Sequence, residues 1–111
     1  MRIMALSLHQ PWATLIAQGR KRFETRSWRT GHRGELLICA AKKRPSNVQL
    51  EFFGLSREDC PLGVAVATVD LVDCSPMTDE LIRQQSDEEL EAGNWRSGRY
   101  AWKLENVNLF R

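Results

Sequence analysis

Hydrophobic and polar residues alternate along several segments of the chain, which is the pattern of half-buried β-strands. The alternation is clear in residues 2–8 (RIMALSL) and 98–110 (GRYAWKLENVNLF). Residues 34–41 (GELLICAA) form a short apolar run, and residues 63–74 (GVAVATVDLVDC) are the longest strand signal in the chain. We therefore predict a strand in each of these four segments.

The segment that follows the first predicted strand has the signals of a short helix. In residues 9–19, Pro11 stands where a first helical turn tolerates proline, and Gly19 can end the helix in the left-handed conformation. The apolar residues lie at spacings of three and four, which places them on one helical face: Trp12, Leu15 and Ile16.

Two further segments predict helices with polar caps. Residues 46–54 (SNVQLEFFG) begin with a capping serine and end with a glycine. Residues 78–93 (TDELIRQQSDEELEAG) predict one broken helix or two short acidic helices, with Thr78 and Ser86 as candidate caps. Strands separated by short helices, without a regular βαβ alternation, favour an α+β fold built on a small β-barrel with peripheral helices.

A fifth segment also alternates with a period of two, but charged residues and a tryptophan share one of its faces. From Lys21 to Arg29 a period of two places Arg22, Glu24, Arg26 and Trp28 on one side, with Phe23, Thr25 and Ser27 on the other. A strand that serves only the core needs apolar residues on one face, so an acid, bases and an indole on one face indicate a site. Because side chains fill a barrel of this size, a ligand has to bind in a cleft between barrel and helix.

Composition limits the classes that the chain can belong to. Its 111 residues are 42% hydrophobic and 27% charged, which predicts one globular domain over residues 1–111. No apolar run approaches the ~20 residues that span a bilayer, so we expect no membrane association and a cytoplasmic location. Cys39, Cys60 and Cys74 are widely spaced, so we expect reduced thiols, small buried side chains at Cys39 and Cys74, and neither a metal nor a cofactor.

Charge is distributed unevenly although the net charge is only +2. Residues 20–44 contain nine Lys and Arg against two Glu, whereas residues 51–91 contain eleven Asp and Glu against two Arg. This asymmetry suggests a basic face that can meet phosphates and an acidic face in water, although solvated charge runs explain either half about as well.

The segment LSLHQPWATLIAQGRKRFETRSW, with its G-x-K-x-x-E-x-R core at residues 19–26, resembles the ASCH family, relatives of the PUA RNA-binding domains. The strand segments 34–41 and 63–74 and the closing W-x-x-G-x-Y-A-W-x-L-E-N follow in the family's order. The resemblance covers nearly the whole chain. It implies a PUA-like β-barrel of about five or six strands with a helix beside a cleft, and binding of single-stranded RNA or nucleotides.

The matched motif and its neighbours supply the candidate binding residues. Lys21 and Arg26 are cations that can grip a phosphate, and we expect both to be solvent-accessible; an internal Glu24–Arg26 ion pair is the structural alternative. Glu24 can accept hydrogen bonds from a base edge. The remaining candidates are two further cations and three aromatic rings on which bases can stack, although Trp12 and Trp102 can equally belong to the core: Arg20, Arg22, Trp28, Trp12 and Tyr100.

A catalytic role would involve Lys21, Glu24 and Thr25. One branch of the family resembles amidohydrolases of the modified nucleoside N4-acetylcytidine, in which a threonine follows the lysine by three residues; here Glu24 occupies that position. Thr25, next along the strand, should face the opposite side. Asp70 and Asp73 are candidates for a further acid, or simply groups at a strand end. We therefore expect no efficient release of acetate from N4-acetylcytidine.

Three classes of function follow. The leading hypothesis is a nucleic-acid or nucleotide binding module. The alternatives are a small hydrolase acting on a modified nucleoside or on RNA, and a protein-interaction adaptor that uses the acidic segment 79–91. A solvated helix face is the simpler explanation of this segment.

Overall fold

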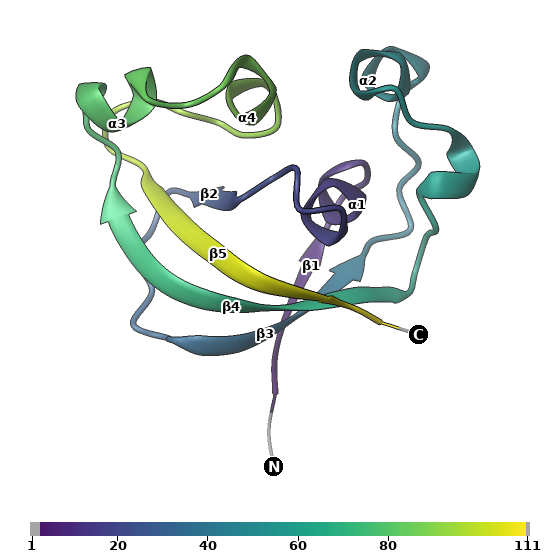
Figure 1. Cartoon of the computed structure of the whole chain (residues 1–111), viewed down its shortest axis with the longest axis horizontal. Helices are drawn as coiled ribbons and strands as arrows, with labels where there is room; N and C mark the ends of the chain where they lie inside the picture. The colour runs from purple at the N-terminus through teal and green to yellow at the C-terminus, as the bar shows by residue number, and fades with distance from the viewer. Residues whose placement is uncertain (1–2, 111) are drawn as a thin grey trace.

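The computed structural model describes residues 3–110, which form one five-stranded sheet and four short α-helices (Figure 1). The strand order is β1-β3-β4-β5-β2, so β1 and β2 are the two edges. Only β1 and β3 pair in parallel; the other neighbours are antiparallel. The strands are β1 (Met4–Leu8), β2 (Phe23–Arg26), β3 (Gly34–Ala40), β4 (Ala65–Pro76) and β5 (Tyr100–Leu109).

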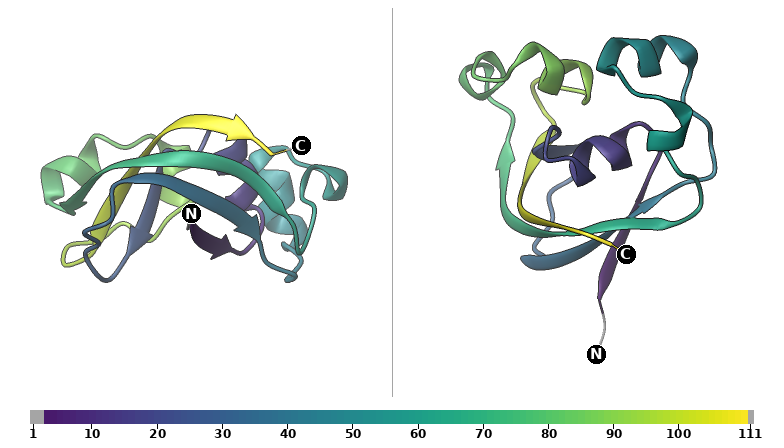
Figure 2. Two further views of the ribbon diagram at one scale, coloured as in Figure 1. Left: turned by 90° about the horizontal axis from the view of Figure 1, so that it is seen from below. Right: turned by 45° about the vertical axis from the view of Figure 1, so that its right-hand side comes forward.

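The sheet curls because its two longest strands bend. Register shifts interrupt the β4–β5 pairing at two places and the β3–β4 pairing at one, and such bulges increase strand twist. Seen from below, β3, β4 and β5 form the arched outer surface, and no helix covers them (Figure 2). The predicted small PUA-like β-barrel with peripheral helices is therefore confirmed, as a curled half-barrel.

The helices lie on the concave side of this half-barrel (Figure 1). Ala13 and Ile16 of α1 (Trp12–Ala17) are fully buried and pack against apolar side chains of the sheet, such as Ile38 and Val69. Beyond α1 lie α2 (Asn47–Phe53), the single-turn helix η1 (Arg57–Asp59), α3 (Asp79–Arg83) and α4 (Asp87–Glu91). Within residues 3–110, no helix is long and apolar enough to cross a bilayer.

Local chemistry sets these helix ends as the sequence predicts. Ser46 accepts a hydrogen bond from the N–H of Gln49 in a capping box, and Gly54 ends α2 with φ +67°. Thr78 and Ser86 cap α3 and α4, so the acidic segment forms two short helices. Gly19 follows α1 with φ +74°.

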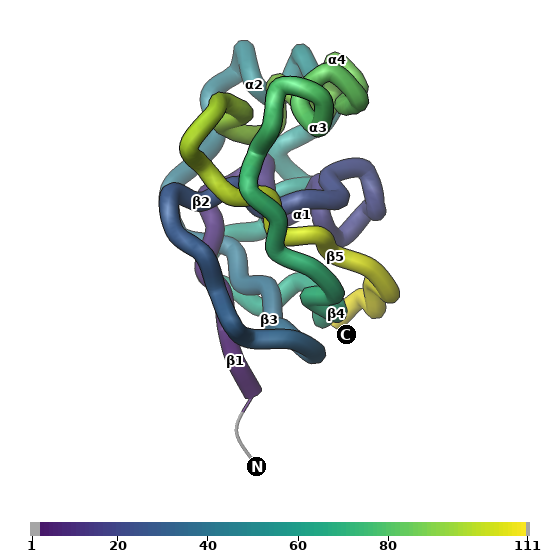
Figure 3. Tube along the Cα trace, turned by 90° about the vertical axis from the view of Figure 1, so that its left-hand side faces the viewer, coloured from purple at the N-terminus to yellow at the C-terminus, as the bar shows by residue number. Residues whose placement is uncertain are grey.

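The strand predicted over residues 21–29 is shorter in the structure. The N–H groups of Arg20 and Lys21 both donate to the carbonyl of Leu15, which keeps these residues in the turn after α1. The strand ends at Arg26, so Trp28 lies beyond it, in the connection that descends from β2 to β3 (Figure 3). All three cysteines are free; Cys60 is buried, whereas Cys39 and Cys74 are only partly buried.

Candidate functional site

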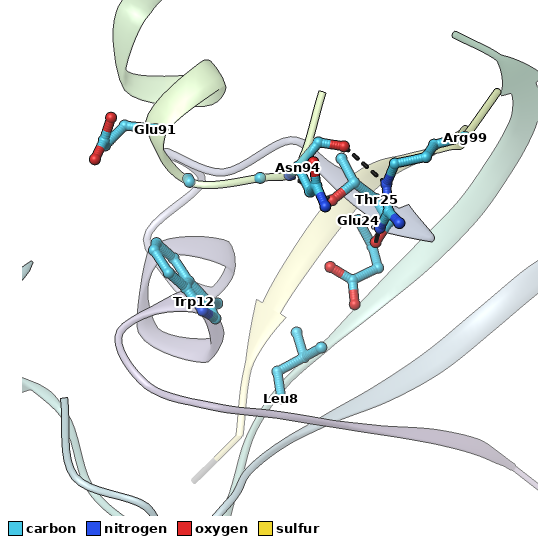
Figure 4. Close-up of a pocket in the computed structure, with 9 residues that line it drawn as sticks. Leu8, Trp12, Glu24, Thr25, Glu91, Asn94 and Arg99 are labelled. Atoms are coloured by element: carbon cyan, nitrogen blue, oxygen red, sulfur yellow. Dashed lines mark hydrogen bonds between the residues drawn. The ribbon is translucent and has the colours of Figure 1, made fainter. Parts of the chain in front are cut away.

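A cleft of about 340 Å³ opens where the two edge strands of the sheet approach each other. Leu8, the last residue of β1, forms one side, and Glu24 and Thr25 of β2 form the other. Trp12 of α1 and the connection from α4 to β5 complete the walls (Figure 4). The other residues that line the cleft are Glu91, Ala92, Gly93, Asn94 and Arg99.

Glu24 places a carboxylate in this cleft (Figure 4). The residue is only 6% exposed. Its Oε2 accepts a hydrogen bond from the Arg26 Nε (2.9 Å) and forms an ion pair with Nη2 at 2.8 Å, whereas Oε1 lies 4.0 Å from the Lys21 Nζ. No hydrogen bond to Oε1 forms within residues 3–110. The carboxylate is therefore fixed in place by one oxygen and keeps acceptor capacity on the other.

Lys21 is buried behind the cleft and does not line it. Its ammonium donates to the carbonyl of Ala92 at 2.8 Å. Burial lowers the pKa of Lys21, while the carboxylates of Glu24 and Glu89 act in the opposite direction. The expectation that Lys21 is solvent-accessible is therefore wrong, because α4 and the residues after it fold over the turn that follows α1. Arg26 is partly buried in the ion pair with Glu24.

Glu89 is a buried carboxylate near Lys21 that the sequence analysis did not identify. It stands at the third position of α4, where Ser86 caps its N–H, and its Oε1 accepts a hydrogen bond from the N–H of Arg22 at 2.7 Å. Its Oε2 has no hydrogen-bond partner among residues 3–110, and burial raises the pKa of Glu89. The spacing Ser-x-x-Glu marks a helix N-terminus but does not tell which of the neighbouring acids turns inward.

The cleft wall at residues 92–99 is attached to β2 by several hydrogen bonds. Thr25 Oγ1 accepts from the N–H of Asn94 at 3.0 Å, and the Arg99 guanidinium donates to the carbonyls of Asn94 (2.9 Å) and Thr25 (3.3 Å) (Figure 4). Gly93 packs closely against β2: a Cβ at this position would lie only 2.9 Å from the Thr25 Cγ2, so a larger residue would clash. Thr25 thus lines the same cleft as Glu24, although we expected it on the opposite side: the 92–99 connection covers the edge of β2.

Of the aromatic candidates, Trp12 lines the cleft, and Trp28, Tyr100 and Trp102 do not. The Trp12 ring lies edge-to-face against Phe53. Trp102 is buried in the core and donates from Nε1 to the Trp28 carbonyl. Trp28 itself is 52% exposed, and the guanidinium of Arg26 lies 5.2 Å from its ring centroid. The guanidinium of Arg29 lies 5.6 Å from the ring centroid of Tyr100. Neither Arg29 nor Tyr100 lines the cleft.

The other predicted residues lie away from the cleft. Arg20 is used internally: it pairs with Glu88 at 2.7 Å and donates to the Phe53 carbonyl. Arg22 is exposed and lines a separate polar groove beside β5. Asp70 accepts a hydrogen bond from Asn106, and Asp73 one from Ser75. Neither aspartate lines the cleft, so neither is placed to act with Glu24.

Comparison with known proteins identifies similar sequences. The ASCH domain family matches residues 6–110. Two curated relatives, both named Activating signal cointegrator 1, are 45% (Mus musculus) and 44% (Homo sapiens) identical to this chain over 80 residues. Each alignment covers 62% of this chain and 14% of the relative, so the chain corresponds to a small part of these longer proteins.

Proposed function

The chain belongs to the ASCH domain family, and from that premise we propose that it binds single-stranded RNA or a nucleotide, with one base held in the cleft beside Glu24. The observation that carries this proposal is the buried carboxylate itself. It lines a cleft of about 340 Å³, within the size range of small-ligand sites, and retains one oxygen free of hydrogen bonds.

A carboxylate in this setting favours a ligand with amino groups. Carboxylate side chains accept hydrogen bonds from exocyclic amines, such as that of cytosine. A base amine that reaches Oε1 would donate to a charged acceptor, and hydrogen bonds to charged groups are stronger than those between neutral groups. Because the hydrogen bond and the ion-pair contact from Arg26 both go to Oε2, Oε1 does not have to give up a hydrogen bond when the base enters.

The rings around the cleft suit an unstacked base. Trp12 and Leu8 supply apolar surface within the cleft, and single-strand binders gain about 1–3 kcal/mol from each base stacked on an aromatic ring. Trp28 with Arg26, and Tyr100 with Arg29, present two further rings beside cations. Neighbouring bases of the same strand can stack there.

The alternatives receive less support. A hydrolase that uses Lys21 as base or nucleophile needs its ammonium in the cleft, whereas Nζ is directed at the Ala92 carbonyl. Thr25 is in the cleft, but its Oγ1 is already engaged as the acceptor of the Asn94 N–H, and no hydrogen bond within residues 3–110 links it to the Glu24 carboxylate. An adaptor based on residues 79–91 loses part of its acidic surface, because Glu89 turns inward and Glu88 pairs with Arg20.

Substitution of Glu24 tests the proposal. We expect the wild type to bind oligocytidylate better than oligouridylate, because uracil lacks the exocyclic amine, and Glu24→Gln to reduce this preference about tenfold, within the range of one specific base contact. Titrations of fluorescein-labelled hexanucleotides at low salt measure this preference, with Glu35→Gln in β3, which is exposed and does not line the cleft, as control and circular dichroism to verify folding. Absence of binding to every oligonucleotide, or an unchanged preference in Glu24→Gln, contradicts the proposal.

A further inference from the structure

A second hollow lies on the side of α1 away from β2, between two connections of the chain. It has a volume of about 370 Å³ and lies between the segment after β3 and the segment around η1. Its lining combines two arginines with apolar surface: Arg44, Arg57, Pro45, Cys60, Pro61 and Leu62. We call it the Arg44–Arg57 groove.

The groove is strongly basic at its rim. Arg44 and Arg57 of η1 line the groove, and Lys42 and Lys43 directly precede Arg44 and are exposed. Within residues 3–110 none of these four cations forms an ion pair, in contrast to Arg20 and Arg26, which are paired with Glu88 and Glu24. Charges left without counterions on the protein attract an anionic ligand.

Two of these cations are held in position. The stem of Lys42 lies over Gly63, so close that a Cβ at Gly63 would be 3.2 Å from the Lys42 Cγ. The guanidinium of Arg57 donates to the Asn47 Oδ1 at 3.2 Å. Side chains that are already partly ordered lose less conformational entropy when they bind a ligand.

The segment from Leu8 to Trp12 connects the cleft to the groove through hydrogen bonds. The Leu8 carbonyl accepts a hydrogen bond from Ala41, directly before the basic run, and the Gln10 side chain donates to the Pro61 carbonyl at 2.8 Å. Leu8 and Trp12 line the cleft, whereas Pro61 lines the groove. A chain-like ligand that leaves the cleft over this segment therefore meets the basic run next.

We propose that the Arg44–Arg57 groove binds the phosphodiester backbone of the nucleic-acid strand whose base occupies the cleft; this inference rests on the proposed function. Arginine guanidinium groups match phosphate oxygens in a bidentate way, and prolines and a leucine offer apolar contact to a sugar or base between the phosphates. An acidic peptide has the same sign of charge, but the link from the groove to a base-sized cleft through Gln10 and Pro61 favours a nucleotide chain.

The test separates the groove from the cleft by ligand length. Cytidine 5′-monophosphate, followed by calorimetric titration, reports on the cleft, and a fluorescein-labelled six-nucleotide cytidine RNA reports on both sites. We compare the wild type, the double variant Arg44→Ala/Arg57→Ala, and the charge-matched control Arg83→Ala/Arg96→Ala, which removes two exposed cations that line neither site.

Arg44→Ala/Arg57→Ala should weaken binding of the hexanucleotide and reduce the slope of log K against log salt by about 1.4, as two lost phosphate contacts on a single strand predict. Mononucleotide binding and the control should not change. An unchanged slope, or an equal change in the control, overturns the groove proposal even if the cleft binds the mononucleotide. Conversely, groove-dependent hexanucleotide binding without mononucleotide binding supports the groove and contradicts the cleft. Hexaglutamate binding that depends on these arginines, with no such dependence for RNA, overturns the proposal in favour of an acidic peptide.

Discussion

Lys21 and Glu24 are three residues apart in one motif, and their side chains meet at 4.0 Å. They nevertheless serve different parts of the molecule. Glu24 lines the cleft, whereas Lys21 lies behind it and donates to the Ala92 carbonyl. The charge of Lys21 is surrounded by Glu24 and by Glu89, which are both buried. Lys21 is thus a positioning residue that holds the cleft wall and the carboxylates in place.

Lys21→Ala should lower the free energy of unfolding by about 3 kcal/mol, because removal of one partner of a buried ion pair leaves the remaining charges uncompensated. Urea denaturation followed by circular dichroism measures the loss. Arg22→Ala is the matched control: its side chain is exposed, so its effect should stay within about 0.5 kcal/mol. Equal stability of Lys21→Ala and the wild type would show that this cluster does not hold the fold together.

At the scale of elements, α4 and the 92–99 connection decide the shape of the cleft. They are fastened to the turn after α1 and to β2 through Glu89 and Lys21, and through Thr25 with Arg99. Phe23 and Trp95 add an edge-to-face aromatic contact with ring centroids 5.3 Å apart. The position of this wall therefore sets the width of the cleft.

Gly93→Ala should distort this wall. A Cβ at Gly93 would lie 2.9 Å from the Thr25 Cγ2 and 2.8 Å from the Trp95 Nε1, and overpacking of this kind costs typically about 1–3 kcal/mol. We expect a lower melting temperature and weaker hexanucleotide binding. Gly31→Ala is the control, because a Cβ there meets nothing within 4 Å. If both variants behave as the wild type, the wall tolerates displacement and does not define the cleft.

The docking of α4 should depend on pH through Glu89. Burial raises the pKa of Glu89 in the folded protein, so its contribution to stability is largest below the ordinary value of 4.5 and is lost as the pH rises through the folded value. Glu89→Gln cannot ionise but can still accept the Arg22 hydrogen bond.

We therefore expect the stability of the wild type relative to Glu89→Gln to fall as the pH rises above the ordinary carboxyl value of 4.5. Denaturant titrations at several pH values provide this difference, and the exposed Glu91→Gln serves as the comparison. A difference that stays constant or grows with pH would mean that Glu89 is not destabilised by burial.

The elements could be predicted from sequence because their signals are local. Ser46, Gly54, Thr78 and Ser86 act within a few residues of the helix ends that they define, and the alternation of β4 and β5 follows from one buried face. The short length of β2 could not be predicted, since it depends on bonds from Arg20 and Lys21 to Leu15.

At the scale of the whole molecule, the sheet remains open and the cleft lies at the opening. The order β1-β3-β4-β5-β2 leaves β1 and β2 unpaired with each other, and the cleft has Leu8 on one side and Glu24 on the other. The G-x-K-x-x-E-x-R motif pointed to Glu24 from sequence alone. Asn94, Arg99 and Glu89 could not be found in that way. About 70 residues separate them along the chain from the residues around β2 that they contact, so only the tertiary structure brings them together.

The distribution of charge leads to the last prediction. Within the basic stretch 20–44, Arg20, Lys21 and Arg26 are engaged internally, whereas Lys42, Lys43 and Arg44 are exposed and free of ion pairs within the described residues 3–110. Affinity for single-stranded RNA should therefore fall steeply as salt rises, because binding releases counterions from the phosphates. The free energy of unfolding should change little over the same range, because partly buried pairs such as Glu24–Arg26 are screened less than exposed charges. Titrations of a labelled hexanucleotide at about 50 mM and about 200 mM salt, with urea denaturation under both conditions, measure the two effects separately. Binding that ignores salt would exclude phosphate recognition by the exposed cations, and a parallel loss of stability would mean that salt weakens the fold and not the interface.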